Sequence, residues 1–378
     1  MKFKSKFSLA VFLTIFAFLC VFLPLGGLNK AKITANGAGG SAFIAMEVTS
    51  GRVLQGSNTQ AKLPMASTTK AMTALVVLEK CDTNSIVTIP RKAVGIEGSS
   101  IYLKEGEKLT VNDLLYGLML RSGNDTAVAL AIFTAGSEEN FVKLMNLKAQ
   151  ELGLKNTNFT NPHGLHNQNH YTTAYDLAVI SCVAMQNPKF KEIVSAKSFT
   201  VQGEGKETRH LANKNKILFM YQGGTGIKTG FTKVAGRCLI ASSERNGMEV
   251  VAVALNCPDM WNDCMGLMDY SHANYHMVKA IDKDFNYRIL PVSGGKSDSV
   301  LLYAKNDKYY PLKKDGSEHF ETSLSTASSL KAPVKKGAEA GKIQVTLGNR
   351  LLFEEKLYSI VSVDKKGFWD KFKDFFKD

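Results

Sequence analysis

The chain shows three successive patterns of hydrophobic and polar residues. The first is a mostly apolar run from Phe7 to Leu28 with three lysines before it, and no acidic residue occurs before Glu47. A positive start followed by an apolar run predicts an export signal, and this run approaches the roughly 20 residues that span a membrane. We therefore interpret residues 1–28 as a signal peptide or N-terminal anchor, followed by a Gly-rich linker at 29–40.

The second pattern covers residues 41–285 and contains both strand-like and helix-like segments. Strand-like runs at both ends of this region are joined in pairs by short turns: 41–48 with 52–54 and 237–243 with 248–256. Good helix formers with few breakers predict a helix at 65–80, and apolar residues at helical spacing predict one at 137–152. Further helices are predicted at 112–133, 173–185 and 260–281. We therefore expect an α/β or α+β sheet flanked by helices, in which the first hairpin joins the later strands.

The third pattern begins after residue 285 and consists of short strand-like runs between Gly-, Asn- and Lys-rich turns. The runs lie at 300–304, 343–347, 351–353 and 357–363. Their alternation with turns predicts a separate small all-β domain at 286–363. This segment has no nucleophile beside a base, so we place the chemistry in residues 41–285.

Residues 364–378 end the chain with an amphipathic pattern. From position 367 onward, five large aromatic residues fall on one face of a helix: Phe368, Trp369, Phe372, Phe375 and Phe376. Lysines and aspartates fill the opposite face, which predicts that residues 367–378 form a helix lying in the membrane interface. The alternative is a terminal helix that packs against its own domain.

The net charge of the chain restricts the kinds of binding partner that we expect. A formal net charge of +13, from 47 basic and 34 acidic residues, favours anionic partners such as nucleic acid, lipid headgroups or a charged polymer. The export pattern decides among them, because the positive-inside rule places the rest of the chain outside the cytoplasm. We therefore expect no nucleic-acid partner and a location on the outer face of the cytoplasmic membrane.

Cysteines and histidines form no recognisable metal site. Five cysteines follow the apolar run at spacings that match no zinc pattern, so we expect small hydrophobic packing residues, with a Cys257–Cys264 disulfide as the alternative. His163, His166 and His170 lie in one polar loop, without the His-Glu-x-x-His helix of zinc peptidases. We therefore expect neither a metal nor another cofactor.

The first element with recognisable chemistry is Ser67-Thr68-Thr69-Lys70, near the start of the predicted helix 65–80. A step of three residues puts Ser67 and Lys70 on one helix face. A serine hydroxyl becomes a good nucleophile when a base takes its proton, and a lysine is such a base when burial or nearby cations lower its pKa. Alone, Ser-x-x-Lys is a weak signal.

Two further elements follow in a set order. Ser122-Gly123-Asn124 lies in an apolar helical context, and Lys228-Thr229-Gly230 opens the late strand-rich region. Ser-x-x-Lys, Ser-Asp-Asn and Lys-Thr-Gly are the signature of serine β-lactamases and penicillin-binding proteins. Here Gly123 replaces the aspartate of the middle element. The three together are far more specific than any one of them.

The surroundings of these elements resemble one family within that group. The matching segments are Gly95–Ser100, Leu118–Asp125, Asn161–Leu165 and Gly226–Thr232. Over residues 41–285 the chain resembles the low-molecular-weight penicillin-binding proteins, which are serine-type D-alanyl-D-alanine carboxypeptidases. The resemblance implies a β-lactamase/transpeptidase-like domain, with an antiparallel sheet flanked by helices and a helical subdomain. The β-rich domain and the amphipathic end resemble that family's C-terminal additions in layout.

The resemblance also implies roles for the residues of the first two motifs. Ser67 would attack the carbonyl between the last two D-alanines of a peptidoglycan stem peptide, and Lys70 would accept its proton. Ser122 would relay a proton to the leaving amine. Asn124 would orient the substrate amide and Lys70.

The third motif then binds the substrate. By the same resemblance, Lys228 supplies positive charge and Thr229 a hydroxyl near the terminal carboxylate, while Gly230 lets the strand backbone approach the substrate. The backbone N–H groups of Ser67 and Phe231 form the oxyanion hole. Lys228 also helps to keep Lys70 neutral.

β-Lactam antibiotics are the inhibitors that this resemblance implies. Glu151 and Asn156 only partly match the deacylating glutamate motif of class A β-lactamases, so we expect a long-lived penicillin acyl-enzyme. Two alternatives stand beside the carboxypeptidase: a β-lactamase or esterase of the same superfamily, and a non-catalytic, membrane-tethered cell-wall-binding protein. The intact motif residues argue against the second alternative.

Overall fold

The computed structural model describes residues 41–203 and 208–369. The predicted signal or anchor at 1–28, the linker at 29–40 and most of the amphipathic end, 370–378, lie outside the described residues. Within the described ranges, no helix has the length and apolar character needed to cross a membrane.

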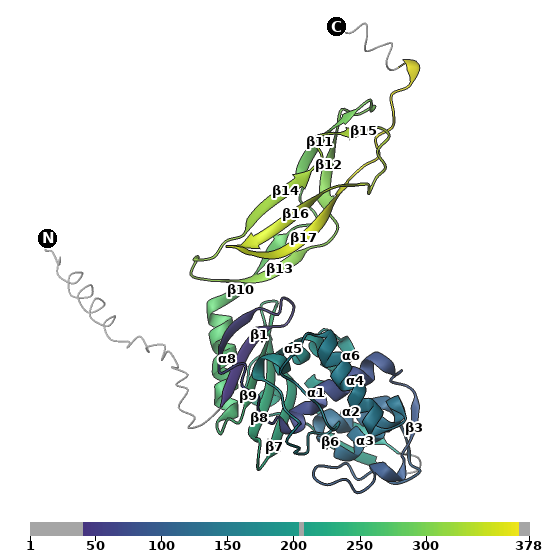
Figure 1. Ribbon diagram of the computed structural model, residues 1–378, viewed down its shortest axis with the longest axis vertical. Coiled ribbons are helices and arrows are strands. Elements are labelled where there is room, and N and C mark those ends of the chain that lie inside the picture. The colour runs from purple at the N-terminus through teal and green to yellow at the C-terminus, as the bar shows by residue number, and fades with distance from the viewer. Residues whose placement is uncertain (1–40, 204–207, 370–378) are drawn as a thin grey trace, which may run out of the picture. The chain divides into compact units, whose positions relative to one another are not determined.

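A five-stranded antiparallel sheet forms the centre of the first part of the chain (Figure 1). Its strand order is β2-β1-β9-β8-β7, built from β1 (Ala42–Glu47), β2 (Val53–Ser57), β7 (Gly224–Thr232), β8 (Gly236–Arg245) and β9 (Met248–Leu255). Ala42 of β1 pairs with Leu255 of β9, so the first hairpin joins the late strands as predicted. β7 forms one edge of this sheet.

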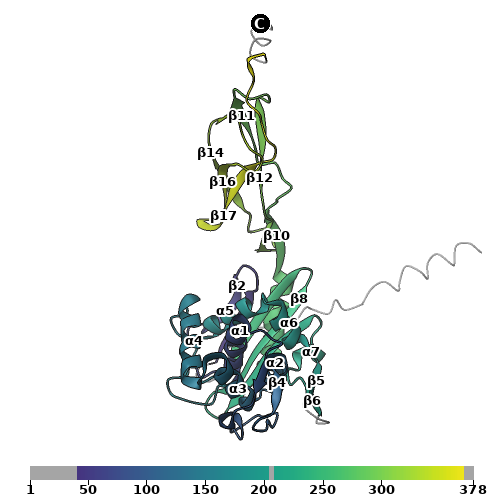
Figure 2. The ribbon, with the colours of Figure 1, turned by 90° about the vertical axis from the view of Figure 1, so that its right-hand side faces the viewer.

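Helices cover both faces of the sheet, and Figure 2 looks onto the larger of the two helical layers. The larger layer comprises α1 (Lys70–Lys80), α2 (Val111–Leu120), α3 (Asn124–Ala135), α4 (Glu138–Glu151), α5 (Ala174–Met185) and α6 (Pro188–Ser195), and α8 (Met260–Asn274) packs on β8 and β9. This part of the chain also contains three short helices: η1 (Ala66–Thr69), η2 (Arg91–Ala93) and α7 (Ile217–Met220). Two further pairs of antiparallel strands are β3 (Ile86–Thr88) with β4 (Lys108–Thr110) and β5 (Ser198–Gln202) with β6 (Thr208–Ala212). This arrangement confirms the predicted antiparallel sheet with flanking helices.

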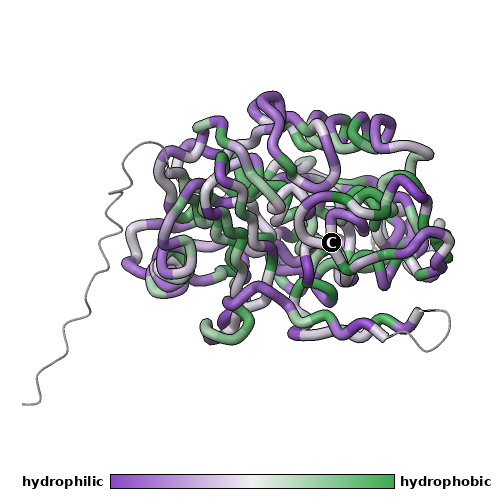
Figure 3. The backbone as a smooth tube through the Cα atoms, turned by 90° about the horizontal axis from the view of Figure 1, so that it is seen from below, coloured by the Kyte–Doolittle hydropathy of each residue, from purple (hydrophilic) through white to green (hydrophobic). Residues whose placement is uncertain are grey.

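The core of this part lies between the sheet and the larger helical layer. Ile44 of β1 and Ile240 of β8 belong to one hydrophobic cluster with Met72, Leu114 and Phe141 from the helices. Hydrophilic residues occupy much of the outline of the backbone tube, and hydrophobic stretches lie between them (Figure 3). The five described cysteines are all free thiols, so Cys257 and Cys264 form no disulfide.

Two predicted helices differ from the structure. The helix predicted at 112–133 is two helices, because the chain breaks at Arg121–Gly123, where Ser122 adopts a φ of +64°. The helix predicted at 260–281 ends at Asn274, and Tyr275–Ile281 forms strand β10, which pairs with β13 (Lys308–Lys313). The apolar spacing fitted both structures, and a partner strand later in the chain decided between them.

The later part of the chain is β-rich, as predicted. β10 (Tyr275–Ile281) pairs with β13 (Lys308–Lys313), and a six-stranded sheet has the order β14-β16-β17-β12-β11-β15. Its strands are β11 (Arg288–Ser293), β12 (Ser299–Ala304), β14 (Glu321–Thr326), β15 (Leu330–Lys331), β16 (Glu339–Leu347) and β17 (Arg350–Ser359). A separate hydrophobic cluster that includes Leu302, Val345 and Leu357 holds it together.

Candidate active site

Ser67 lies in the single turn η1 that leads directly into α1. The preceding Ala66 is held at a φ of +47°, a left-handed conformation that costs a residue other than glycine about 1–3 kcal/mol. Such strain persists where the surroundings fix the backbone, and here it sets the direction in which the half-buried Ser67 side chain points. One turn later, Lys70 Nζ lies 3.3 Å from Ser67 Oγ.

Lys70 is completely buried and surrounded by oxygen atoms. Its Nζ donates to Asn124 Oδ1 at 2.7 Å and to the carbonyl oxygen of His163 at 2.6 Å. Burial lowers the pKa of Lys70 well below its ordinary value, and the positive charge of Lys228 lowers that pKa further, against a smaller opposing effect of Asp125. Both causes favour the neutral amine of Lys70 over the ammonium ion.

Ser122 and Asn124 come from the break between α2 and α3. Ser122 is 5% exposed and lines a cavity that also contains Ser67. Asn124 is held from both ends, because its backbone N–H donates to the carbonyl of Ser99 at 2.7 Å and its side-chain nitrogen donates to that of Glu97 at 2.5 Å. The amide oxygen of Asn124 therefore faces Lys70 in a fixed orientation.

Hydrogen bonds to Asp125 hold the loop at 100–103 next to the Ser122-Gly123-Asn124 motif. The buried carboxylate of Asp125 accepts the backbone N–H of Ile101 at 3.0 Å, that of Leu103 at 3.1 Å and the hydroxyl of Ser100 at 2.5 Å. Three donors from one loop thus converge on a single side chain. The loop that supplies Ser99 to the cavity is positioned by this carboxylate.

Gly123 has a steric reason to be glycine. A Cβ at this position would lie 2.6 Å from Thr126 Oγ1 and 2.7 Å from Asp125 Oδ1. The Asp125 carboxylate is already fixed by the loop, and Thr126 Oγ1 donates to the carbonyl of Gly123 at 2.9 Å. An aspartate in place of Gly123, as in the Ser-Asp-Asn form of the motif, does not fit this arrangement.

Lys228, Thr229 and Gly230 lie in the edge strand β7. Lys228 is 1% exposed, and burial with the nearby charge of Lys214 lowers its pKa to about 7. Its Nζ donates to the carbonyl of Thr229 at 2.9 Å. A Cβ on Gly230 would come within 3.1 Å of the backbone nitrogen of Ser67, so glycine here allows β7 to lie close to Ser67.

One cavity of about 460 Å³ joins the three motifs. It is lined by Ser67, Ser99, Ser122, Lys214, Thr229, Gly230, Phe231, Arg237, Met260 and Trp261. Lys70, Asn124 and Lys228 are buried behind this surface. Five of the nominated site residues therefore face one space, and the other three support it. Lys214 and Arg237 were not nominated from the sequence, because no motif contains them.

The loop at 161–164 supplies a contact that the sequence reasoning missed. His163 contributes its carbonyl oxygen to Lys70, while burial lowers the pKa of its ring to about 3. Gly164 packs so closely on Ala66 that a Cβ would overlap the Ala66 carbonyl oxygen. His170 contacts Thr69 Oγ1 at 2.8 Å, and burial lowers its pKa to about 4. These histidines support the lysine and the turn η1.

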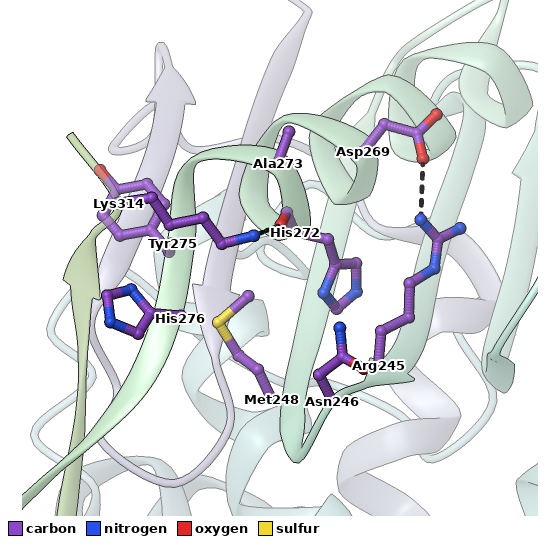
Figure 4. A pocket seen from close by; sticks show the side chains of 9 residues that line it. All are labelled: Arg245, Asn246, Met248, Asp269, His272, Ala273, Tyr275, His276 and Lys314. Atoms are coloured by element: carbon purple, nitrogen blue, oxygen red, sulfur yellow. Dashed lines mark hydrogen bonds and ion pairs between the residues drawn. The ribbon is translucent and has the colours of Figure 1, made fainter.

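A second cavity, of about 420 Å³, contains none of the motif residues. It lies at the β8–β9 turn and the end of α8, where Arg245 pairs with Asp269 at 3.4 Å (Figure 4). Lys314 Nζ donates to the carbonyl of His272 at 2.7 Å, and His272 Nε2 lies 2.8 Å from Ser243 Oγ. Its charged groups already have protein partners, so we place the active site at Ser67.

Comparison with known proteins assigns this constellation to a family. A family model described as D-alanyl-D-alanine carboxypeptidase matches residues 30–259. The chain belongs to this family. A second model, described as the C-terminal domain of penicillin-binding protein 5, matches residues 275–365. The chain is therefore a serine-type D-alanyl-D-alanine carboxypeptidase with a penicillin-binding protein architecture.

Alignments with individual carboxypeptidases extend over most of the chain. The D-alanyl-D-alanine carboxypeptidase DacF of Bacillus subtilis is 31% identical over 87% of this chain and 90% of its own length. DacC of Escherichia coli is 31% identical over 95% of this chain and 93% of its own length. The crystal structure of penicillin binding protein 5 from Haemophilus influenzae, 30% identical, superposes with a TM-score of 0.70 and covers 86% of this chain and 97% of that one.

Proposed function

We propose that this carboxypeptidase removes the terminal D-alanine of peptidoglycan stem peptides through an acyl-enzyme on Ser67. The observation that carries the proposal is the set of contacts around Lys70. A neutral amine has two N–H donors and one lone pair, and two carbonyl-type oxygens, on Asn124 and His163, take the two donors. The lone pair is left for the hydroxyl proton of Ser67, 3.3 Å away.

The reaction then runs in two steps. Ser67 Oγ forms a bond to the carbonyl carbon of the penultimate D-alanine while its proton passes to Lys70. The peptide C–N bond breaks, Ser122 relays a proton to the leaving amine, and free D-alanine departs. A water molecule, deprotonated by Lys70, cleaves the resulting ester and restores Ser67.

The remaining site residues bind and polarise the substrate. In this proposal the backbone N–H groups of Ser67 and Phe231 form the oxyanion hole, and the close approach of Gly230 to Ser67 supports this role. Thr229 supplies a hydroxyl for the terminal carboxylate. Lys228, buried beside Lys70, keeps that lysine neutral through its charge.

β-Lactams acylate the same serine in this proposal, and the acyl-enzyme is long-lived. Glu151, the closest sequence match to a deacylating glutamate, is the last residue of α4 and forms an exposed ion pair with Lys148 at 2.8 Å. Glu151 is not among the residues that line the catalytic cavity. This supports slow release of the drug and disfavours a β-lactamase.

We also propose that the enzyme acts on the outer face of the bacterial cytoplasmic membrane. The lysine-led apolar run at 1–28 and the aromatic stripe that begins at Phe368 support this location. In this proposal the chain consists of a catalytic domain at 41–285, a small β-rich domain at 286–363 and a membrane-associating end at 364–378.

Labelling with a fluorescent penicillin, followed by mass spectrometry of the modified peptide, tests the proposed function. A stable adduct on Ser67, together with release of D-alanine from a stem-peptide substrate, is the expected result. Rapid turnover of the drug indicates a β-lactamase instead. An adduct that never forms indicates the non-catalytic wall-binding protein.

A further inference from the structure

The catalytic cavity exposes two cations, neither of which belongs to a motif. Lys214 and Arg237 line it and are exposed, whereas Lys228 is buried behind it. Lys214 Nζ contacts Ser99 Oγ at 3.3 Å. Within residues 41–203 and 208–369, Arg237 makes no ion pair or side-chain hydrogen bond. A guanidinium with five N–H donors thus faces the substrate space with no partner among the described residues.

Strand register places Arg237 beside Thr229. Arg237 of β8 pairs with Phe231 of β7, and Leu239 pairs with Thr229. Directly paired residues in an antiparallel ladder point to the same face, so Arg237 and Thr229 are diagonal neighbours on one face of the sheet. Diagonal Cβ atoms lie roughly 7–8 Å apart, within reach of a long side chain. Lys228 points to the other face, with Ile240 and the helical core.

The proposed hydrolysis, on which this inference rests, fixes where the terminal carboxylate lies. The scissile carbonyl oxygen accepts from the N–H of Phe231, and the leaving amine faces Ser122. The substrate then lies along the free edge of β7 with its last residue beside Gly230 and Thr229. Adjacent residues are about 3.8 Å apart, so the carboxylate of that residue falls near the Thr229 hydroxyl.

We propose that Arg237 is the charged receptor of the substrate's terminal carboxylate and makes the enzyme selective for peptides that end in a free acid. The guanidinium and the Thr229 hydroxyl together bind the two carboxylate oxygens. A planar guanidinium matches a carboxylate better than an ammonium does, because it donates two parallel N–H groups. Lys214 adds positive potential at the same mouth of the cavity. Lys228 acts on Lys70 instead.

The test compares two substrates that differ only at the carboxylate. Release of the last residue is measured for a diacyl-L-lysyl-D-alanyl-D-alanine peptide and for the same peptide with a terminal carboxamide. In Arg237→Gln the ratio of the two kcat/KM values, free acid over amide, falls about 10- to 100-fold, the usual effect of one charge-assisted hydrogen-bond pair. Arg237→Lys keeps an intermediate ratio. Arg350→Gln, an exposed arginine in β17, keeps the wild-type ratio.

Each other outcome overturns the inference in a distinct way. An unchanged ratio in Arg237→Gln, in an active enzyme labelled by penicillin, refutes the role of Arg237 and leaves the hydrolysis standing. Collapse of the ratio in Lys228→Gln but not in Arg237→Gln assigns the carboxylate to Lys228. A wild-type enzyme that neither releases D-alanine nor takes up penicillin refutes the proposed function and this inference together.

Discussion

Lys70 Nζ lies closer to Asn124 Oδ1, at 2.7 Å, than to Ser67 Oγ, at 3.3 Å. Lys70, the proposed base, is thus held by an amide side chain that is itself fixed by backbone contacts to Glu97 and Ser99. The nucleophile makes the longer contact of the pair. A longer contact of this kind shortens when substrate closes the site, as catalytic hydrogen bonds commonly do.

Replacement of the two central residues separates nucleophile from base. Ser67→Ala is expected to abolish both penicillin labelling and D-alanine release. Lys70→Ala is expected to slow both by about 10²–10⁴-fold, the usual contribution of general-base assistance. Stopped-flow acylation and D-alanine release measure the two steps, with circular dichroism as the control for folding. Release of D-alanine by Ser67→Ala near the wild-type rate would remove Ser67 from its role.

The pH dependence of acylation reports on Lys228. Lys70 acts as a base only when unprotonated, so acylation falls as the pH falls through its lowered pKa. Lys228→Gln removes a positive neighbour, which raises the pKa of Lys70. The acidic limb of the profile is therefore expected to move to higher pH, while the exposed control Lys92→Gln leaves it in place. A limb that stays fixed or moves to lower pH in Lys228→Gln contradicts the electrostatic role.

Asp125 is expected to stabilise the loop beside the active site. Asp125→Asn places two N–H donors where Ile101, Leu103 and Ser100 already donate, so buried donors lose acceptors. The free energy of unfolding is expected to fall by roughly 1–3 kcal/mol. Urea denaturation measures this, with the exposed Asp284→Asn as the control. Equal midpoints for the two variants contradict the prediction.

The aromatic stripe at the end of the chain predicts binding to membranes. Full burial of one large apolar side chain contributes about 1.5–3 kcal/mol, so Trp369→Ala combined with Phe372→Ala should weaken binding at least tenfold. Co-sedimentation with anionic vesicles, using a chain that begins at residue 29, measures this in moderate salt. Phe285→Ala, an exposed aromatic elsewhere, is the control. Undiminished binding by the double variant, or none by the parent, indicates that the stripe packs against protein.

The sequence predicted most of what local pattern controls. The early and late hairpins, three of the five helices and the grouping of Ser67, Ser122 and Thr229 around one space all follow from spacing and motif order. The break at Ser122 and the end of α8 at Asn274 did not. The apolar stretches on either side of Arg121–Asp125 were treated as one helix, and the strand after Asn274 depends on pairing with the distant β13.

Site residues outside the motifs were missed for a related reason. Arg237 faces the cavity only because β8 pairs with β7 in one particular register, and Asp125 matters only because a distant loop donates to it. His163 contributes a backbone oxygen, which any residue type carries. Side-chain chemistry in a sequence therefore identifies reacting groups better than it identifies the groups that position them.

The pairing of β1 with β9 has a consequence for the timing of folding. Ala42 pairs with Leu255, so a nascent chain cannot complete its central sheet until about 200 further residues have been made. At typical rates of synthesis this leaves β1 without its partner for on the order of 10–40 s. If the chain is exported as proposed, this delay keeps its central sheet incomplete while the chain is threaded across the membrane.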